Sequence, residues 1–291
     1  DNGRLRGVVT LADEERALAG SADGKTCNWQ HLRYFKGYSL DSKNPEPWPS
    51  GGDILPGPTL RARVGDLVQL AFFNLIDVSN FPKSLDQAER GETGSCDSAT
   101  ATRRNPKKDG TRTTQIYPQN PDGTPGDTAP NCLHGSSTAN IHFHGTHTTP
   151  STTGDNVLLY VRPALREAGN ISGPVEENVM RQFEQIWKRC ESNGPPTEWD
   201  QLPQEWRNDQ TGLLQQYDKT AAYKGVIGNL PPDMRLWPKN EKQLKKGLWP
   251  QYSIGAFPYC FRLPEYAPPN MKMGQAPGTH WYHAHKHGST A

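Results

Sequence analysis

The chain has 291 residues, of which 32 are basic and 31 acidic, so its formal charge is only +1 at pH 7. This balance excludes a global field that would recruit nucleic acid or an anionic membrane. Only 33% of the residues are hydrophobic, whereas 28 are Gly and 26 are Pro. Such a composition favours a mainly β protein with many turns and long loops over a helical bundle.

No stretch of the sequence approaches the roughly 18 to 20 consecutive apolar residues of a transmembrane helix, so we expect no membrane partner. The sequence begins at Asp1 without an apolar, signal-like segment, which fits either a cytosolic protein or a mature form already processed. Of these two we expect the processed form, in a secreted or periplasmic protein.

The five cysteines are widely spaced and form no CxxC pattern, which argues against a thiolate zinc site or a redox motif. They are Cys27, Cys96, Cys132, Cys190 and Cys260. Disulfides would leave one cysteine over, and the spacing does not decide their pairing. One candidate bridge joins Cys96 to Cys132 and would close a long loop.

The first part of the chain predicts short strands separated by loops. Arg6–Leu11 and His31–Tyr38 have the composition of strands, and the segment around Glu14 to Ala19 is expected to be a helix or loop. A Pro- and Gly-rich run from 44 to 58 predicts a connecting loop. Beyond it, apolar and basic residues alternate from Leu60 to Val64, Gly65 and Asp66 mark a turn, and 67–73 is a more buried strand. This pattern is typical of an antiparallel pair.

The second part predicts two insertions between strands. Residues 75–139 have little periodicity and are expected to form a long loop insertion. After a strand at 155–162, residues 165–250 are expected to form a partly helical insertion. Its helix begins near Ser172 and Pro174 and carries one apolar stripe, made up of Val179, Phe183, Ile186, Trp187 and Cys190. Residues 253–263 return to the alternation of a strand.

Two histidine-rich segments carry the chemistry. Asn140–His147 contains His142 and His144, and Gly278–Gly288 contains His283 and His285. In an extended strand alternate side chains point to the same face, so each pair can present two imidazoles to one metal site. Three histidines on strands would equally suit zinc with a bound water, as in a zinc hydratase.

Four segments together resemble the N-terminal cupredoxin domain of the multicopper oxidases, the superfamily that includes the laccases. They are Pro56–Asp66, His142–Gly145, Gly154–Val157 and Pro277–His285, and they occur in the family's order. The resemblance implies a cupredoxin-like Greek-key β-sandwich. Residues 1–291 would then form a single N-terminal domain, incomplete at its C-terminus and interrupted by the two insertions.

In that family eight histidines from the first and last cupredoxin domains hold a trinuclear copper cluster that reduces O2 to water. The resemblance implies that His142 is a ligand of type 2 copper, and that His144, His283 and His285 are ligands of type 3 copper. It also assigns Asp155 a catalytic role as a proton source near the cluster.

Two features depart from the family pattern. His144 and His283 lie 139 positions apart, a spacing that requires the helical insertion to be looped out of the site. The chain also ends at Ala291, before the strand and the domains that bring the other four ligands and the type 1 copper. We therefore expect C-terminal cupredoxin domains, as a second chain or a missing segment, with O2 and a small one-electron donor as substrates. A copper-binding or carrier subunit without turnover is the alternative.

Overall fold

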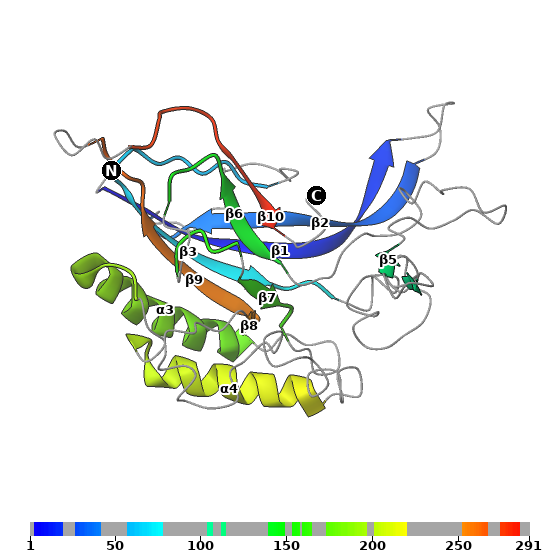
Figure 1. Ribbon diagram of the computed structural model, residues 1–291. Coiled ribbons are helices and arrows are strands. Elements are labelled where there is room, and N and C mark those ends of the chain that lie inside the picture. The colour runs from blue at the N-terminus through cyan, green and yellow to red at the C-terminus, as the bar shows by residue number, and fades with distance from the viewer. Residues whose placement is uncertain are drawn as a thin grey trace.

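The computed structural model describes residues 3–19, 27–41, 57–77, 104–106, 112–114, 139–148, 153–157, 159–164, 173–196, 201–219, 252–266 and 274–285. Within them the chain is mostly β, with mixed parallel and antiparallel strands and two long helices on one side (Figure 1). None of the described helices is long and apolar enough to cross a membrane.

The largest sheet has the strand order β2-β1-β3-β9. These strands are β1 (Arg4–Ala19), β2 (Cys27–Ser39), β3 (Leu67–Asn74) and β9 (Ala256–Arg262). β1 is antiparallel to β2 but parallel to β3, and β3 is antiparallel to β9. Because β9 comes from residues far along the chain, the sheet joins the two ends of the sequence.

The prediction of a helix or loop around Glu14 to Ala19 is wrong, because β1 continues through this segment. Its residues pair one for one with β2, from Glu14 opposite Leu32 to Ala19 opposite Cys27. An ion pair between Lys36 and Glu14 adds a cross-strand contact. The ladder of backbone hydrogen bonds thus outweighs the weak local strand propensity of this polar segment.

The prediction of an antiparallel strand pair around Gly65 is also wrong, although the predicted turn is confirmed. The backbone N–H of Arg63 donates to Asp66 Oδ2 at 2.8 Å, and Gly65 has a φ of 90°. Residues 57–63 form no strand, and both edges of β3 are taken by β1 and β9. Local alternation cannot reveal that a strand has two more distant partners.

Both faces of β3 are buried, which explains its almost continuous apolar sequence. Val68, Leu70 and Phe72 pack into a strand-side core with the short strands described below. Leu67, Ala71 and Phe73 face a helix-side core instead. The large sheet is therefore the middle layer of three.

Short strands cover the first face. β6 (Asn140–His144) is antiparallel to β10 (Trp281–His285), and β7 (Tyr160–Arg162) is parallel to β8 (Tyr252–Ile254). The strands expected at 155–162 and 253–263 are thus only partly confirmed, since residues 153–157 form turns and Gly255, with a φ of 78°, separates β8 from β9. Most of the loop insertion expected at 75–139 lies outside the described residues. Within it, β4 (Arg104–Pro106) and β5 (Arg112–Thr114) form an antiparallel pair.

Two helices cover the second face (Figure 1). α3 (Gly173–Asn193) confirms the helix predicted from Ser172 and Pro174, and its apolar stripe packs into the helix-side core. α4 (Gln204–Lys219) was not predicted as a separate helix. Among its described side chains, which end at residue 213, the buried stripe is short, with Trp206 and Gln210 one turn apart.

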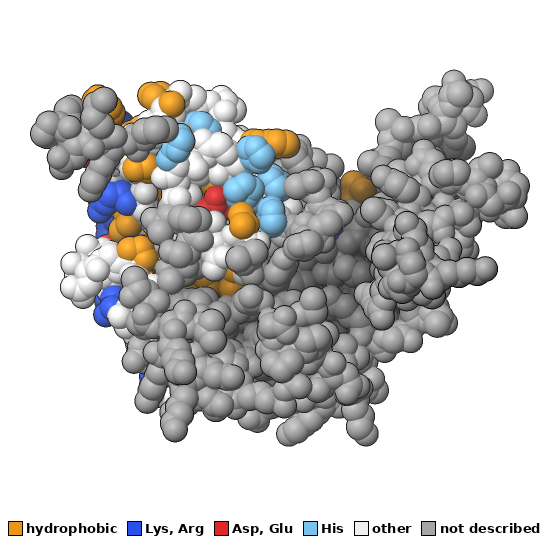
Figure 2. All heavy atoms as spheres, in the orientation of Figure 1, with side chains coloured by type: hydrophobic (Ala, Val, Ile, Leu, Met, Phe, Trp, Pro, Cys, Tyr) orange, Lys and Arg blue, Asp and Glu red, His pale blue; other side chains and the backbone are white. Residues whose placement is uncertain are grey.

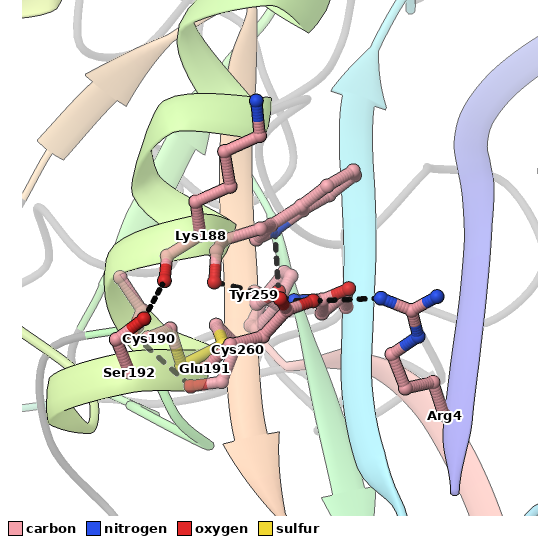
Figure 3. Close-up of a disulfide and its surroundings, with 10 residues drawn as sticks. Arg4, Lys188, Cys190, Glu191, Ser192, Tyr259 and Cys260 are labelled. Carbon is pink, nitrogen blue, oxygen red and sulfur yellow. Dashed lines mark hydrogen bonds and ion pairs between the residues drawn. A yellow bond between two sulfur atoms is a disulfide. The ribbon is translucent and has the colours of Figure 1, made fainter. Parts of the chain in front are cut away.

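A disulfide between Cys190 and Cys260 ties α3 to β9 (Figure 3). Both cysteines are buried, and their Cα atoms lie 6.5 Å apart. Beside the bridge, Trp187 Nε1 donates to the carbonyl of Tyr259 at 3.1 Å, and Arg4 pairs with Glu191 at 3.1 Å. Cys96 and Cys132, the other candidate pair, lie outside the described residues.

Candidate metal centre

The four histidines of the two motifs share one face of the β6 and β10 pair. His283 lies opposite His142 in the register of this pair, while Ile141 and Phe143 point the other way, into the strand-side core. Burial of the alternate apolar residues therefore fixes which way the imidazoles point. Figure 2 shows histidine side chains gathered on one face of the molecule, and Figure 1, in the same orientation, shows β6 and β10 in front of β1 and β2.

Three of these imidazoles converge. His142, His144 and His283 each offer a ring nitrogen, and these atoms all lie within 4.8 Å of one another. The ring centroids of His142 lie 5.4 Å from His144 and 5.3 Å from His283. The structure thus brings together segments 139 residues apart into a group that can hold a metal ion.

His285 adjoins this group of three. Its ring centroid lies 5.5 Å from that of His142 and 6.3 Å from that of His283. Burial, together with the neighbouring His142 and His283 rings, lowers the pKa of His285 below its usual value. Its Nδ1 is buried without a hydrogen-bond partner among the described residues. A neutral imidazole with a free nitrogen is the form in which histidine binds a metal.

Asp155 orients the first imidazole. Its Oδ1 lies 3.0 Å from His142 Nδ1 and accepts a second hydrogen bond, at 3.1 Å, from the backbone N–H of Phe143. The carboxylate is buried, with 6% of its surface exposed. When the ring proton is on His142 Nδ1, this N–H donates a hydrogen bond to the carboxylate. The other ring nitrogen, Nε2, is then free to bind a metal. The geometry is that of a group that positions a ligand.

Similar contacts hold the other parts of the site. His283 Nδ1 lies 3.1 Å from the carbonyl of Ala284, a contact that fixes the tautomer in the same way. Asn140 Nδ2 donates to the carbonyls of Leu159 and Asn156, at 2.6 and 3.0 Å, and so joins β6 to the turn that carries Asp155.

Tyr259 supports β6 from the large sheet. The backbone N–H of Ile141 donates to its hydroxyl at 2.8 Å, and burial raises the pKa of Tyr259 far above its usual value. Burial therefore favours the protonated form of this hydroxyl. Sequence reasoning missed Asn140 and Tyr259, because neither belongs to a metal-ligand pattern; only the position of Asn140 beside His142 hinted at a role.

One side of the centre is open. His144 is exposed, and 64% of the surface of Trp281, whose ring centroid lies 5.0 Å from that of His144, is accessible to solvent. A ligand, or residues from another polypeptide segment, can therefore approach the imidazoles from this side. Of the remaining histidines, His147 and His280 lie beside the centre and contact Gln275, whereas His287 is outside the described residues.

No protein-family model matches the chain, and neither a curated protein nor a solved structure matches it.

Proposed function

We propose that this chain is the N-terminal, copper-binding portion of a multicopper oxidase of the laccase type, with a cupredoxin-like arrangement of its strands. The observation that carries the proposal is the convergence of His142, His144 and His283, with His285 alongside, from two His-x-His strands. The order of the four sequence motifs supports the family, and the mainly β fold is consistent with it.

The donor set fits copper. All the converging groups are imidazoles, which are ligands of borderline softness that suit copper, zinc, iron or nickel. Copper bound there would supply the one-electron chemistry that couples oxidation of a small donor to the four-electron reduction of O2 to water. The chain's own residues would hold the metal in place, with Asp155 fixing the His142 tautomer and lying close enough to exchange a proton with it.

The open side of the centre supports a second component. His144 and Trp281 are exposed there, so the four histidines can supply half of the ligands of a trinuclear cluster while further histidines approach from outside. In this proposal those ligands and a type 1 copper belong to C-terminal cupredoxin domains. Oxidase activity then appears only when these domains are present.

The first experiment is copper binding by the 291-residue chain, stripped of metal and titrated with Cu(II) against a competing chelator. We expect His142→Ala, His144→Ala and His283→Ala each to weaken binding at least tenfold, because each removes one of three convergent ligands. His147→Ala is the matched control, since its exposed imidazole lies outside the group. Equal copper affinity in the control and the three variants would contradict the site.

A mononuclear zinc site is the second candidate, because three imidazoles converge while His285 stands further off. Three histidines plus a water make a catalytic zinc site. Metal analysis of the protein purified together with its C-terminal domains separates the two. The oxidase predicts three coppers at this centre and a fourth at the type 1 site. One zinc and no copper would contradict the oxidase proposal and favour the hydratase-like zinc site. Copper without O2 consumption would favour a copper carrier.

A further inference from the structure

Two segments frame the group of three histidines at the same end of the β6 and β10 pair. Residues 145–148 leave β6 directly after His144, and residues 274–280 lead into β10 directly before Trp281. We propose that Gln275 is a positioning residue of the metal centre, whose side chain joins these segments and so sets the separation of His144 and His283. The inference rests on the proposed metal site and adds a residue that no ligand pattern contains.

The contacts of Gln275 cross between the two segments. Its Oε1 accepts a hydrogen bond from the backbone N–H of His147 at 2.7 Å, and its Nε2 donates to the carbonyl of Gly145 at 3.4 Å. Within its own segment Nε2 donates to the carbonyl of Ala276 at 3.2 Å. Its backbone N–H donates to the carbonyl of Pro264 at 2.7 Å, just beyond β9. One side chain thus connects the exit of β6 to the entrance of β10.

Gln275 is well placed to act as a fixed link. Only 8% of its surface is exposed, so solvent competes little for its amide group. A buried polar group that loses its partner is unfavourable, which favours the fully bonded arrangement over alternatives in which the two segments separate. The link is therefore a structural constraint with a defined geometry.

His280 completes the junction. Its Nε2 lies 3.1 Å from Gln275 Nε2, and its Nδ1 lies so close to Gly145 that an added Cβ there would sit 3.1 Å away. Gly145 also has a φ of 78°, which L residues other than glycine rarely adopt. The chain therefore turns sharply after His144 and packs against the residue that precedes Trp281.

The strands alone constrain the site weakly. β6 and β10 pair over only five residues, and a two-stranded ladder of this length is marginal by itself. At the other end Asn140 anchors β6, and at the His144 end Gln275 provides a cross-strand link among the described residues. Losing this link lets the ladder fray at His144, two pairs away from the facing His142 and His283.

Two substitutions separate the contacts of Gln275. Gln275→Met has a similar volume and removes every side-chain hydrogen bond, whereas Gln275→Glu keeps the acceptor for the His147 N–H and removes the donors. The matched control is Gln210→Met, because Gln210 is also buried and joins α4 to β8 through Ile254 and Ser253, away from the histidines.

The experiment measures Cu(II) affinity, the electron paramagnetic resonance spectrum of bound Cu(II), and amide hydrogen exchange at His147 without metal. We expect Gln275→Met to weaken copper binding about tenfold, the lower end of the range seen when direct partners of metal ligands are removed, because Gln275 acts through the backbone that follows His144. Its copper hyperfine splitting should change and exchange at His147 should rise, with Gln275→Glu in between. Gln210→Met should keep the wild-type affinity, spectrum and His147 exchange.

The outcomes divide clearly. A wild-type chain that binds no copper overturns the proposed function, and faster His147 exchange in Gln275→Met would then still support the link. Wild-type affinity, spectrum and exchange in Gln275→Met overturn the role of Gln275 alone. Equal losses in Gln275→Met and Gln210→Met also overturn it, because they would reflect general destabilisation.

Discussion

At the scale of single residues, Asp155 has the most informative geometry. One carboxylate oxygen serves both the His142 ring and the backbone of the next residue, Phe143. The sequence resemblance assigned Asp155 to proton supply, whereas its contacts describe a group that orients a ligand. The two roles are compatible, because a carboxylate that fixes a tautomer can also exchange a proton, but they respond differently to substitution.

We predict that Asp155→Asn keeps copper affinity within a few-fold of wild type, since the amide oxygen can still accept both hydrogen bonds. Asp155→Ala should weaken binding about 10- to 100-fold, because nothing then fixes the His142 tautomer. If the chain belongs to the proposed oxidase, Asp155→Asn in the complete protein should slow O2 reduction despite normal copper content. Chelator competition and O2 consumption measure these effects, with Asp66→Asn in the distant turn as the control. Equal affinity of Asp155→Ala and wild type would exclude the orienting role.

At the scale of elements, sequence patterns correctly predicted the helix and the strand whose residue order follows directly from which side chains are buried. The α3 stripe was correct because Phe183, Ile186 and Trp187 all face one core, and β3 was correct because it is buried on both faces. The partner of β3 was not predictable, since its parallel pairing with β1 joins segments about 60 residues apart and leaves no local periodicity. The polar end of β1 was not recognised for a different reason, because its residues have weak strand propensity and are held in a strand by their pairing with β2.

The Cys190–Cys260 bridge is the covalent link between the helix layer and the sheet layer. It closes a segment of 70 residues, and in the chain-entropy model a loop of this length contributes about 4 kcal/mol to stability. We predict that the double variant Cys190→Ala/Cys260→Ala loses about 4 kcal/mol of unfolding free energy in urea titrations. Wild-type protein unfolded with a thiol reductant should show the same loss. A change below about 1 kcal/mol would mean that packing of α3 on β9 suffices without the bridge.

At the scale of the whole molecule, the metal centre depends on long-range assembly. Each His-x-His pair could be predicted to share a face, but spacing alone could not show that pairs 139 residues apart become neighbours. From the sequence, only the resemblance to a family placed the two His-x-His pairs in one site. The supporting groups Asn140, Tyr259 and Gln275 come from separate segments, so their roles emerge only from the folded chain.

An apolar cavity of about 730 Å³ is lined in part by β10, the strand that carries His283 and His285. Its wall includes core residues of the large sheet, such as Leu5 and Phe35, together with Leu60 and the strand residues Tyr282 and Ala284. Among the described strands, β10 has β6 as its only partner. A cavity of this size and lining can admit an apolar molecule.

We predict that this cavity binds the aromatic rings of the fluorescent anion 1-anilinonaphthalene-8-sulfonate, with a rise in dye fluorescence when the 291-residue chain is folded. Ala62→Trp, which places a large ring at the wall, should reduce that rise several-fold, whereas Glu177→Trp on the exposed face of α3 should not. If the C-terminal domains cover the cavity, the complete oxidase should bind little dye. Equal fluorescence of the two variants would show that the dye binds elsewhere. Strong dye binding by the complete oxidase would show that the domains leave the cavity open.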